Sequence, residues 1–100
     1  MFEVRQTRLF GDWVAGLRDR QALARINVRI RRLSLGNFGD VKSVGRNVSE
    51  LRLDYGPGYR LYFTRRGEAL VVLLCGGDKL TQAADIATAM KLAKGLEHDG

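Results

Sequence analysis

Residues 48–75 read VSELRLDYGPGYRLYFTRRGEALVVLLC, and this stretch decides the fold. In its first two parts, 48–55 and 59–64, apolar and polar side chains alternate, and a period of two is typical of strands with one buried face. The GPG sequence at 56–58 has the composition of a turn, so the two parts are predicted to form a β-hairpin. Residues 69–75 are continuously apolar, which indicates a central strand that is covered on both faces.

Apolar residues recur at helical spacing on both sides of this stretch. Thr7 and Asp19 are positioned to cap two consecutive helices in the N-terminal third, and Gly36 is the type of residue that ends the second. Because the joint between these helices is short, they are predicted to form a helical hairpin. Thr81 is a candidate cap for a last helix, which is expected to end near Gly95.

Residues 2–5 are predicted to form a first strand, and residues 41–44 are a further candidate. The order of elements is then β-α-α-β-β-β-α, with one additional strand if 41–44 forms it. We expect an α+β fold in which the N-terminal helical hairpin packs on a mainly antiparallel sheet and a C-terminal helix follows. One hundred residues are too few for two hydrophobic cores, so residues 1–100 are expected to form a single domain.

Composition excludes several classes of protein. With 45% hydrophobic and 28% charged residues, the chain has the composition of a soluble globular domain. No apolar run approaches the roughly 20 residues that span a bilayer, and the N-terminus is charged too early for a signal peptide. The chain has one cysteine, which excludes an internal disulfide. One cysteine and one histidine are also too few for the common zinc sites. We therefore expect a cytoplasmic protein that does not span a membrane and that has no metal and no cofactor.

The charge of the chain is strongly positive. Lys and Arg number 17 against 11 Asp and Glu, a formal net charge of +6, and the excess lies between Arg5 and Arg66. A basic small domain indicates an anionic partner, which is a nucleic acid, an acidic protein or membrane headgroups. A solvated surface that is merely rich in arginine remains the alternative. Arginine outnumbers lysine, and its planar fork suits bidentate phosphate contact.

The predicted hairpin brings two of these arginines together. Its expected register places Arg52 opposite Tyr62. The same register places Asp54 opposite Arg60, so Arg52 and Arg60 are diagonal neighbours, roughly 7–8 Å apart, on the face away from the core. An anion that bridges the two cations would relieve their repulsion, and the phenol of Tyr62 could stack on a base or donate to phosphate. Alternatively, Asp54 pairs with Arg60 and this face is a solvated sheet surface.

The segment CGGDKLTQ at 75–82 supplies a third cation. Lys79 is expected at the carboxyl end of the central strand, beside the strand that carries Arg60. No Ser-His or Cys-His pair is expected, so any chemistry rests on arginine, lysine and tyrosine. A cationic cluster can stabilise the pentacoordinate phosphate that forms when a ribose 2′-hydroxyl attacks its neighbouring phosphodiester. RNA carries its own nucleophile, so such a nuclease needs no metal.

Two segments carry a family resemblance: GNFGDVKSVGRNVSELRLDYGPGYRLYF at 36–63 and VVLLCGGDKLTQAADIATA at 71–89. They resemble the phage-derived, HigB-like addiction module killer branch of the RelE/ParE toxin superfamily, over residues 13–92. The resemblance implies a RelE-like toxin domain of a type II toxin–antitoxin pair, neutralised by a cognate helix-turn-helix antitoxin. It also implies that operator DNA is bound only through the antitoxin complex.

Carried over by motif, Arg60 matches the arginine that RelE-like nucleases place on the scissile phosphate. Arg52 falls near their basic strand residues, and Lys79 near the basic residue that follows their last core strand. The catalytic tyrosine that some members carry near the C-terminus has no counterpart, because no tyrosine follows Tyr62. Proton transfer is therefore assigned to Tyr62 or Lys79. Further RNA contacts are expected from four other basic residues: Lys42, Arg46, Arg25 and Arg29.

Two functions remain open. The first is a metal-independent endoribonuclease that cleaves translated mRNA at the ribosome and inhibits translation, as RelE and HigB members do. The second is a non-enzymic inhibitor of DNA gyrase, like ParE members, that binds its target through the basic helices. The cations of the strands favour the nuclease, whereas the lack of an obvious general base favours the inhibitor.

Overall fold

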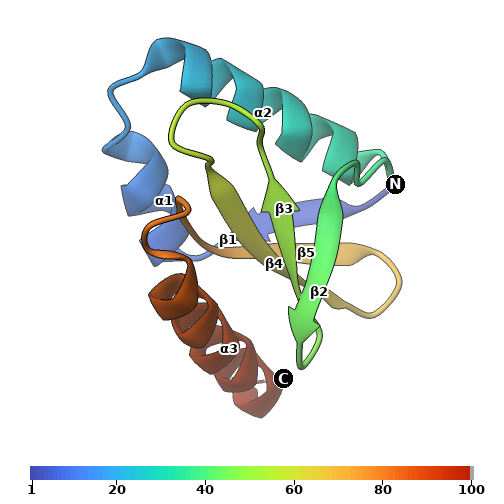
Figure 1. Cartoon of the computed structure of the whole chain (residues 1–100). Helices are drawn as coiled ribbons and strands as arrows, with labels where there is room; N and C mark the ends of the chain where they lie inside the picture. Colours follow the sequence, from blue (N-terminus) through green and yellow to red (C-terminus); the bar gives the residue numbers. More distant parts are fainter. Residues whose placement is uncertain (100) are drawn as a thin grey trace.

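The computed structural model describes residues 1–99 and, of their side chains, those of residues 1–96 (Figure 1). Eight helices and strands follow one another in the chain: β1 (Glu3–Gln6), α1 (Arg8–Ala15), α2 (Arg20–Ser34), β2 (Val41–Gly45), β3 (Val48–Arg52), β4 (Arg60–Arg66), β5 (Leu70–Gly77) and α3 (Gln82–Asp99). The strands form one sheet in the order β1-β5-β4-β3-β2. The predicted hairpin is confirmed as β3 and β4, and the candidate strand at 41–44 is confirmed as β2.

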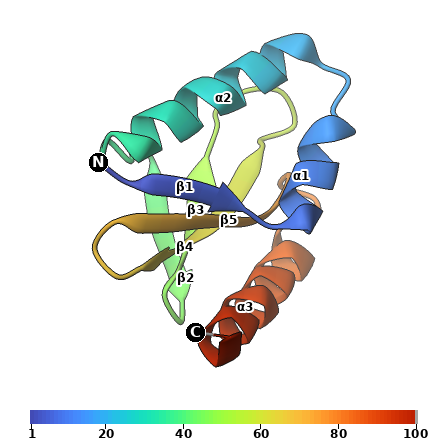
Figure 2. The ribbon, with the colours of Figure 1, turned by 180° about the vertical axis from the view of Figure 1, so that it is seen from behind.

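The expected architecture, an N-terminal helical hairpin packed on a mainly antiparallel sheet, is wrong. The first strand predicted at 2–5 is present as β1, but it pairs in parallel with β5, so the five-stranded sheet is mixed. Helices α1 and α2 do not run side by side as in a hairpin; they meet at a corner, as both views of the ribbon show (Figures 1 and 2).

Aromatic packing explains why α1 leaves α2 and lies on the sheet. Phe10 of α1 is buried in the core, and the ring of Trp13 stands edge-on to Tyr59 at 6.1 Å between centroids. Trp13 also lies against the backbone of β5, where a Cβ on Gly76 would come within 2.4 Å of its ring. A side chain on Gly76 would therefore collide with the ring of Trp13, so this position requires glycine.

Helix caps follow the sequence. The Thr7 hydroxyl accepts a hydrogen bond from the Phe10 N–H at the start of α1, and the Asp19 carboxylate accepts from two N–H groups at the start of α2. Both caps satisfy donors that the first helical turn leaves free. None of the helices in residues 1–99 is long and apolar enough to cross a membrane.

Both faces of the sheet are covered. One face packs against α1 and α2, and its buried side chains are all apolar: Phe10, Ile26, Leu33, Leu51, Leu53, Leu61, Phe63, Val71 and Leu73. The other face packs against α3 and buries a smaller cluster: Val48, Tyr62, Val72, Leu74, Cys75, Ala89 and Ala93. We call these the α1/α2 face and the α3 face. A bulge in β5 lets Leu74 and Cys75 both join the α3 face.

Candidate functional site

The register of the β3–β4 hairpin differs from the predicted one by two residues. Arg52 lies directly opposite Arg60, and Glu50, not Arg52, lies opposite Tyr62. The turn is longer than GPG, because the last backbone bond of the hairpin joins the Leu53 N–H to the Tyr59 carbonyl. Asp54 is thus in the loop and not opposite Arg60. We call residues 53–58 the β3–β4 loop.

Arg52, Arg60 and Lys79 line one cleft of about 480 Å³ beside the β3–β4 loop. Its walls also carry the carboxylates of Asp40 and Asp54. These three cations are the ones predicted from the sequence to take part in catalysis, and the fold brings them together.

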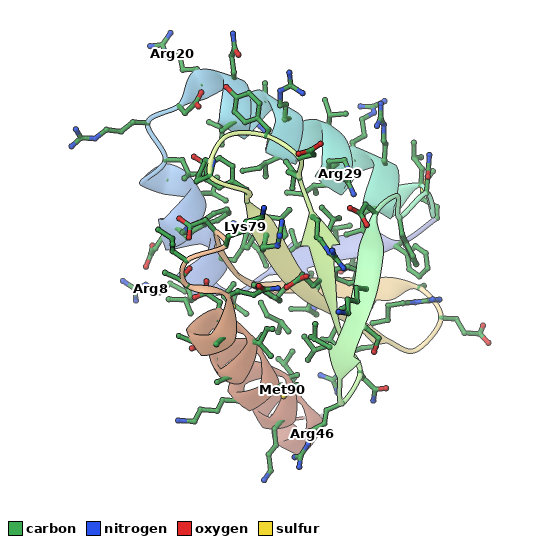
Figure 3. All side chains as sticks on the ribbon, in the orientation of Figure 1. Arg8, Arg20, Arg29, Arg46, Lys79 and Met90 are labelled. Atoms are coloured by element: carbon green, nitrogen blue, oxygen red, sulfur yellow. The ribbon has the colours of Figure 1, made fainter. Side chains whose placement is uncertain are left out.

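The Lys79 side chain lies against the tip of the β3–β4 loop. A Cβ on Gly58 would come within 3.0 Å of Lys79 Cγ, so the aliphatic stem of the lysine packs over this glycine. Gly58 has φ +81°, a conformation that favours glycine at this turn position. Figure 3 shows Lys79 beside this loop, at the centre of the molecule. Lys79 is exposed and also lines the cleft, so its stem holds the side chain beside this loop.

The expectation that Arg60 lies on a free sheet face is wrong. Arg60 is only 8% exposed. The sheet face that carries it was expected to meet solvent or an anion, but α3 covers that face. The guanidinium of Arg52 is more open, with a side chain 36% exposed. The cleft therefore has a buried cation in its floor and a partly exposed one beside it.

Glu50 is a site residue that the sequence analysis missed. It is 1% exposed, and its Oε2 accepts hydrogen bonds from the Tyr62 hydroxyl at 3.0 Å and from Gln82 Nε2 at 2.8 Å. Its Oε1 lies 3.3 Å from Arg52 Nε and 3.9 Å from Arg60 Nε. The only sequence signal was the alternation of β3, which placed Glu50 and Arg52 on one face without saying that a helix would cover it.

Tyr62 lies beneath the cleft and not in it. Its side chain is fully buried, and its hydroxyl donates to Glu50. Burial, reinforced by the hydrogen bond and the charge of Glu50, raises the pKa of Tyr62 well above its ordinary value. The phenol is therefore protonated at neutral pH, and its proton is engaged by Glu50.

A second cleft, of about 500 Å³, lies on the other side of the β3–β4 loop and is lined by α2. Arg25 faces it with its guanidinium 4.5 Å from the centroid of the Tyr55 ring. Arg29 also lines it but is tied to the backbone, since it donates to the Arg52 carbonyl at 2.6 Å. Burial lowers the pKa of Arg29. Residues 53–55 are the wall that the two clefts share.

The two remaining predicted RNA contacts lie apart from each other. Lys42 is exposed on β2, directly opposite Glu50 in the sheet, and it does not line the first cleft. Arg46 is in the turn between β2 and β3, near Met90 of α3 and at the opposite end of the sheet from Lys79 (Figure 3). The fold therefore brings neither Lys42 nor Arg46 into the cleft, although Lys42 lies on the strand next to Glu50.

The described residues include one thiol and no group of side chains suited to a metal ion. Cys75 is buried, and burial followed by the charge of Asp85 raises the pKa of its thiol to about 12, so it is not a thiolate at neutral pH. Within the same residues, no three His, Cys, Asp or Glu side chains form a group that could hold a metal ion.

The sequence is similar to that of an uncharacterized protein of Haemophilus influenzae. The two are 49% identical over 94 residues, which are 94% of this chain and 95% of that protein. No protein-family model matches the chain, and no solved structure matches it.

Proposed function

We propose, on the premise that this chain belongs to the same family as the uncharacterized Haemophilus influenzae protein, that it is the toxin of a type II toxin–antitoxin pair. In this proposal it acts in the cytoplasm as a metal-independent endoribonuclease, cleaves translated mRNA at the ribosome and so inhibits translation. The resemblance of residues 36–63 and 71–89 to RelE/ParE toxins supports the proposal.

The observation that carries the nuclease assignment is that Arg52, Arg60 and Lys79 all line the same cleft. In the proposed reaction the ribose 2′-oxygen forms a bond to phosphorus and the bond to the 5′-oxygen breaks. Guanidinium groups at the cleft stabilise the charge that develops on the phosphate oxygens. The exposed ammonium of Lys79 donates a proton to the departing 5′-oxygen.

The proton of the 2′-hydroxyl needs an acceptor, and the carboxylates of Asp40 and Asp54 in the cleft walls are suitable bases. Tyr62, which the sequence analysis considered for proton transfer, is buried and bound to Glu50, so we assign it to support of the site. The proposed partners are mRNA on the ribosome and a cognate helix-turn-helix antitoxin. Operator DNA is bound only through the antitoxin complex, and no membrane takes part.

A second candidate function is non-enzymic inhibition of DNA gyrase. It is favoured by the engagement of the Tyr62 hydroxyl with Glu50, which removes one group that proton transfer could use. Binding of gyrase would use the arginines of α2 that line the second cleft.

The experiment that decides between them is expression from a tightly controlled promoter, with mapping of the 5′ ends of cellular mRNA and a parallel assay of gyrase supercoiling. The nuclease hypothesis predicts growth arrest and new mRNA 5′ ends, both relieved by co-expression of the neighbouring antitoxin gene. It also predicts unchanged gyrase supercoiling. Lost supercoiling with intact mRNA selects the gyrase inhibitor. Normal growth and intact mRNA at full expression would contradict the toxin assignment.

A further inference from the structure

We infer that Glu50 is the positioning residue of the cleft: a buried counter-ion that holds the guanidinium groups of Arg52 and Arg60 in place and limits how strongly they attract RNA in the ground state. The inference rests on the proposed function and identifies a residue to which neither the family resemblance nor the similar protein assigns a role.

The side chain of Glu50 is itself held by two hydrogen-bond donors. Its own strand lies at the centre of the β2-β3-β4 part of the sheet, between Lys42 on β2 and Tyr62 on β4. The Tyr62 hydroxyl and the Gln82 amide of α3 both donate to Oε2. A carboxylate with two donors on one oxygen has little freedom to rotate, so its other oxygen, Oε1, is aimed at a fixed place.

That fixed place is the space between the two arginines. Oε1 is within ion-pair distance of Nε of Arg52 and of Arg60, at 3.3 and 3.9 Å. These three atoms are buried, and none of them has a hydrogen-bond partner among the described residues. The attraction is thus Coulombic. Among the described residues no hydrogen bond joins a terminal nitrogen of either arginine to Glu50, and Nη1 of Arg60 donates to the Tyr59 carbonyl at 3.5 Å. Because buried charges interact strongly, this attraction orients the guanidinium groups.

The same carboxylate reduces the positive charge of the cleft. Two like charges lie directly opposite each other on neighbouring strands, an arrangement that is unfavourable without a compensating anion. Glu50 supplies that anion inside the protein. An RNA phosphate in the cleft therefore meets arginines that are oriented but partly neutralised. Binding energy is thereby reserved for the transition state, in which the phosphate carries more charge.

This arrangement predicts opposite effects on binding and on catalysis. Glu50→Gln keeps the size of the side chain but removes its charge, so ground-state RNA binding should tighten by about fivefold. The same change frees the guanidinium groups to rotate, so kcat should fall by about 10²-fold. Loss of packing alone would lower the folded fraction and would not tighten binding.

The test measures both quantities on purified full-length protein. Binding is followed by fluorescence anisotropy with a single-stranded 12-mer RNA that carries 2′-O-methyl groups and cannot be cleaved. Cleavage is followed on mRNA bound to purified ribosomes, and circular dichroism gives the folded fraction. The matched control is Glu68→Gln, which makes the same change of net charge at the exposed turn between β4 and β5 and should leave Kd and kcat unchanged.

Gln82→Met keeps the test decisive if Glu50→Gln does not fold. It removes a donor to Oε2 while the charge of Glu50 remains, so kcat should fall with Kd unchanged. An unchanged kcat in folded Gln82→Met, or a folded Glu50→Gln that behaves like Glu68→Gln in both assays, would overturn the inference. So would weaker RNA binding by folded Glu50→Gln.

The two proposals fail separately. If the wild-type protein cleaves no mRNA, the proposed nuclease is wrong, and the binding assay still decides about Glu50. Tighter RNA binding by Glu50→Gln then supports its role as counter-ion, and an unchanged Kd overturns it.

Discussion

The α1/α2 face and the α3 face of the sheet are both buried, yet their chemistry differs. On the α1/α2 face the buried side chains are aliphatic or aromatic, and the cluster is the larger of the two. On the α3 face the apolar cluster adjoins Glu50, Arg60 and the hydroxyl of Tyr62. Burying charged groups lowers stability unless they are paired. We call the part of the α3 face that holds these groups its charged end.

The difference separates the residues that hold the fold from those that form the site. The apolar face can be explained by the hydrophobic effect alone. The charged end of the α3 face cannot, because apolar residues of similar volume often fill such a place with equal or greater stability. The proposed function offers an explanation of these charges, since Arg60 and Arg52 line the same cleft as Lys79.

The largest expected effect is that of Arg60→Ala, which tests the charged end directly. It leaves Glu50 buried with a single arginine, so the free energy of unfolding should fall by about 3–5 kcal/mol. In the folded fraction, mRNA cleavage should fall by about 10²–10³-fold. Urea unfolding and cleavage on ribosomes measure the two quantities. Arg8→Ala, an exposed arginine of α1, is the control. Full toxicity of Arg60→Ala would contradict the proposed site.

The next effect belongs to the apolar face. Leu61→Ala leaves a cavity beside Leu51 and should lower the free energy of unfolding by about 2–5 kcal/mol. Because Leu61 points away from the cleft, the folded fraction should keep its cleavage activity per molecule. The check is cleavage at a temperature where circular dichroism shows the variant folded. A specific loss of activity without a loss of stability would show that the two faces are not separable.

A moderate effect comes from alkaline pH, because the α3 face buries a thiol and a phenol. Burial raises the pKa of Cys75 to about 12 and raises that of Tyr62. The unfolded groups lose their protons near pH 8.5 and 10. The stability is therefore complete below about pH 8 and falls as pH rises toward the folded values, by up to about 1.4 kcal/mol per pH unit and group.

Urea unfolding between pH 8 and 11 measures this loss. Tyr62→Phe removes one of the two acids and should give a shallower slope, whatever its stability at neutral pH. An identical slope in the two proteins would show that Tyr62 does not titrate as its burial requires.

The smallest effect concerns the second cleft. Arg25→Gln removes an exposed cation that stacks on Tyr55, and the free energy of unfolding should change by no more than about 0.5 kcal/mol. If single-stranded RNA crosses the β3–β4 loop, its affinity should fall severalfold, and the slope of log K against log salt should decrease by about 0.7. An unchanged slope would confine RNA to the first cleft.

The sequence by itself determined most of the local structure. The caps at Thr7 and Asp19, the alternation in β3 and β4 and the apolar run of β5 are short-range patterns, and each produced the element that it predicts. The sequence also determined which cations meet, because Arg52, Arg60 and Lys79 sit at the same end of neighbouring strands whichever register the hairpin adopts.

Only the tertiary structure decided the register of that hairpin. A shift of two residues leaves every side chain on the same face of the sheet, so alternation cannot detect it. The pairing of Arg52 with Arg60 and of Glu50 with Tyr62 depends instead on a loop two residues longer than its glycine and proline residues indicate. The parallel pairing of β1 with β5 likewise joins segments far apart in the chain, which no local pattern reports.

The burial of the site was decided in the same way. The face that carries Glu50 and Arg60 is polar in sequence and reads as a solvated surface. It becomes an interior because Ala89 and Ala93, far along the chain, bring α3 against it. Local periodicity tells which side chains share a face, but whether that face meets water or a helix depends on contacts between distant segments. That long-range contact turns an ordinary surface glutamate into the buried partner of two arginines.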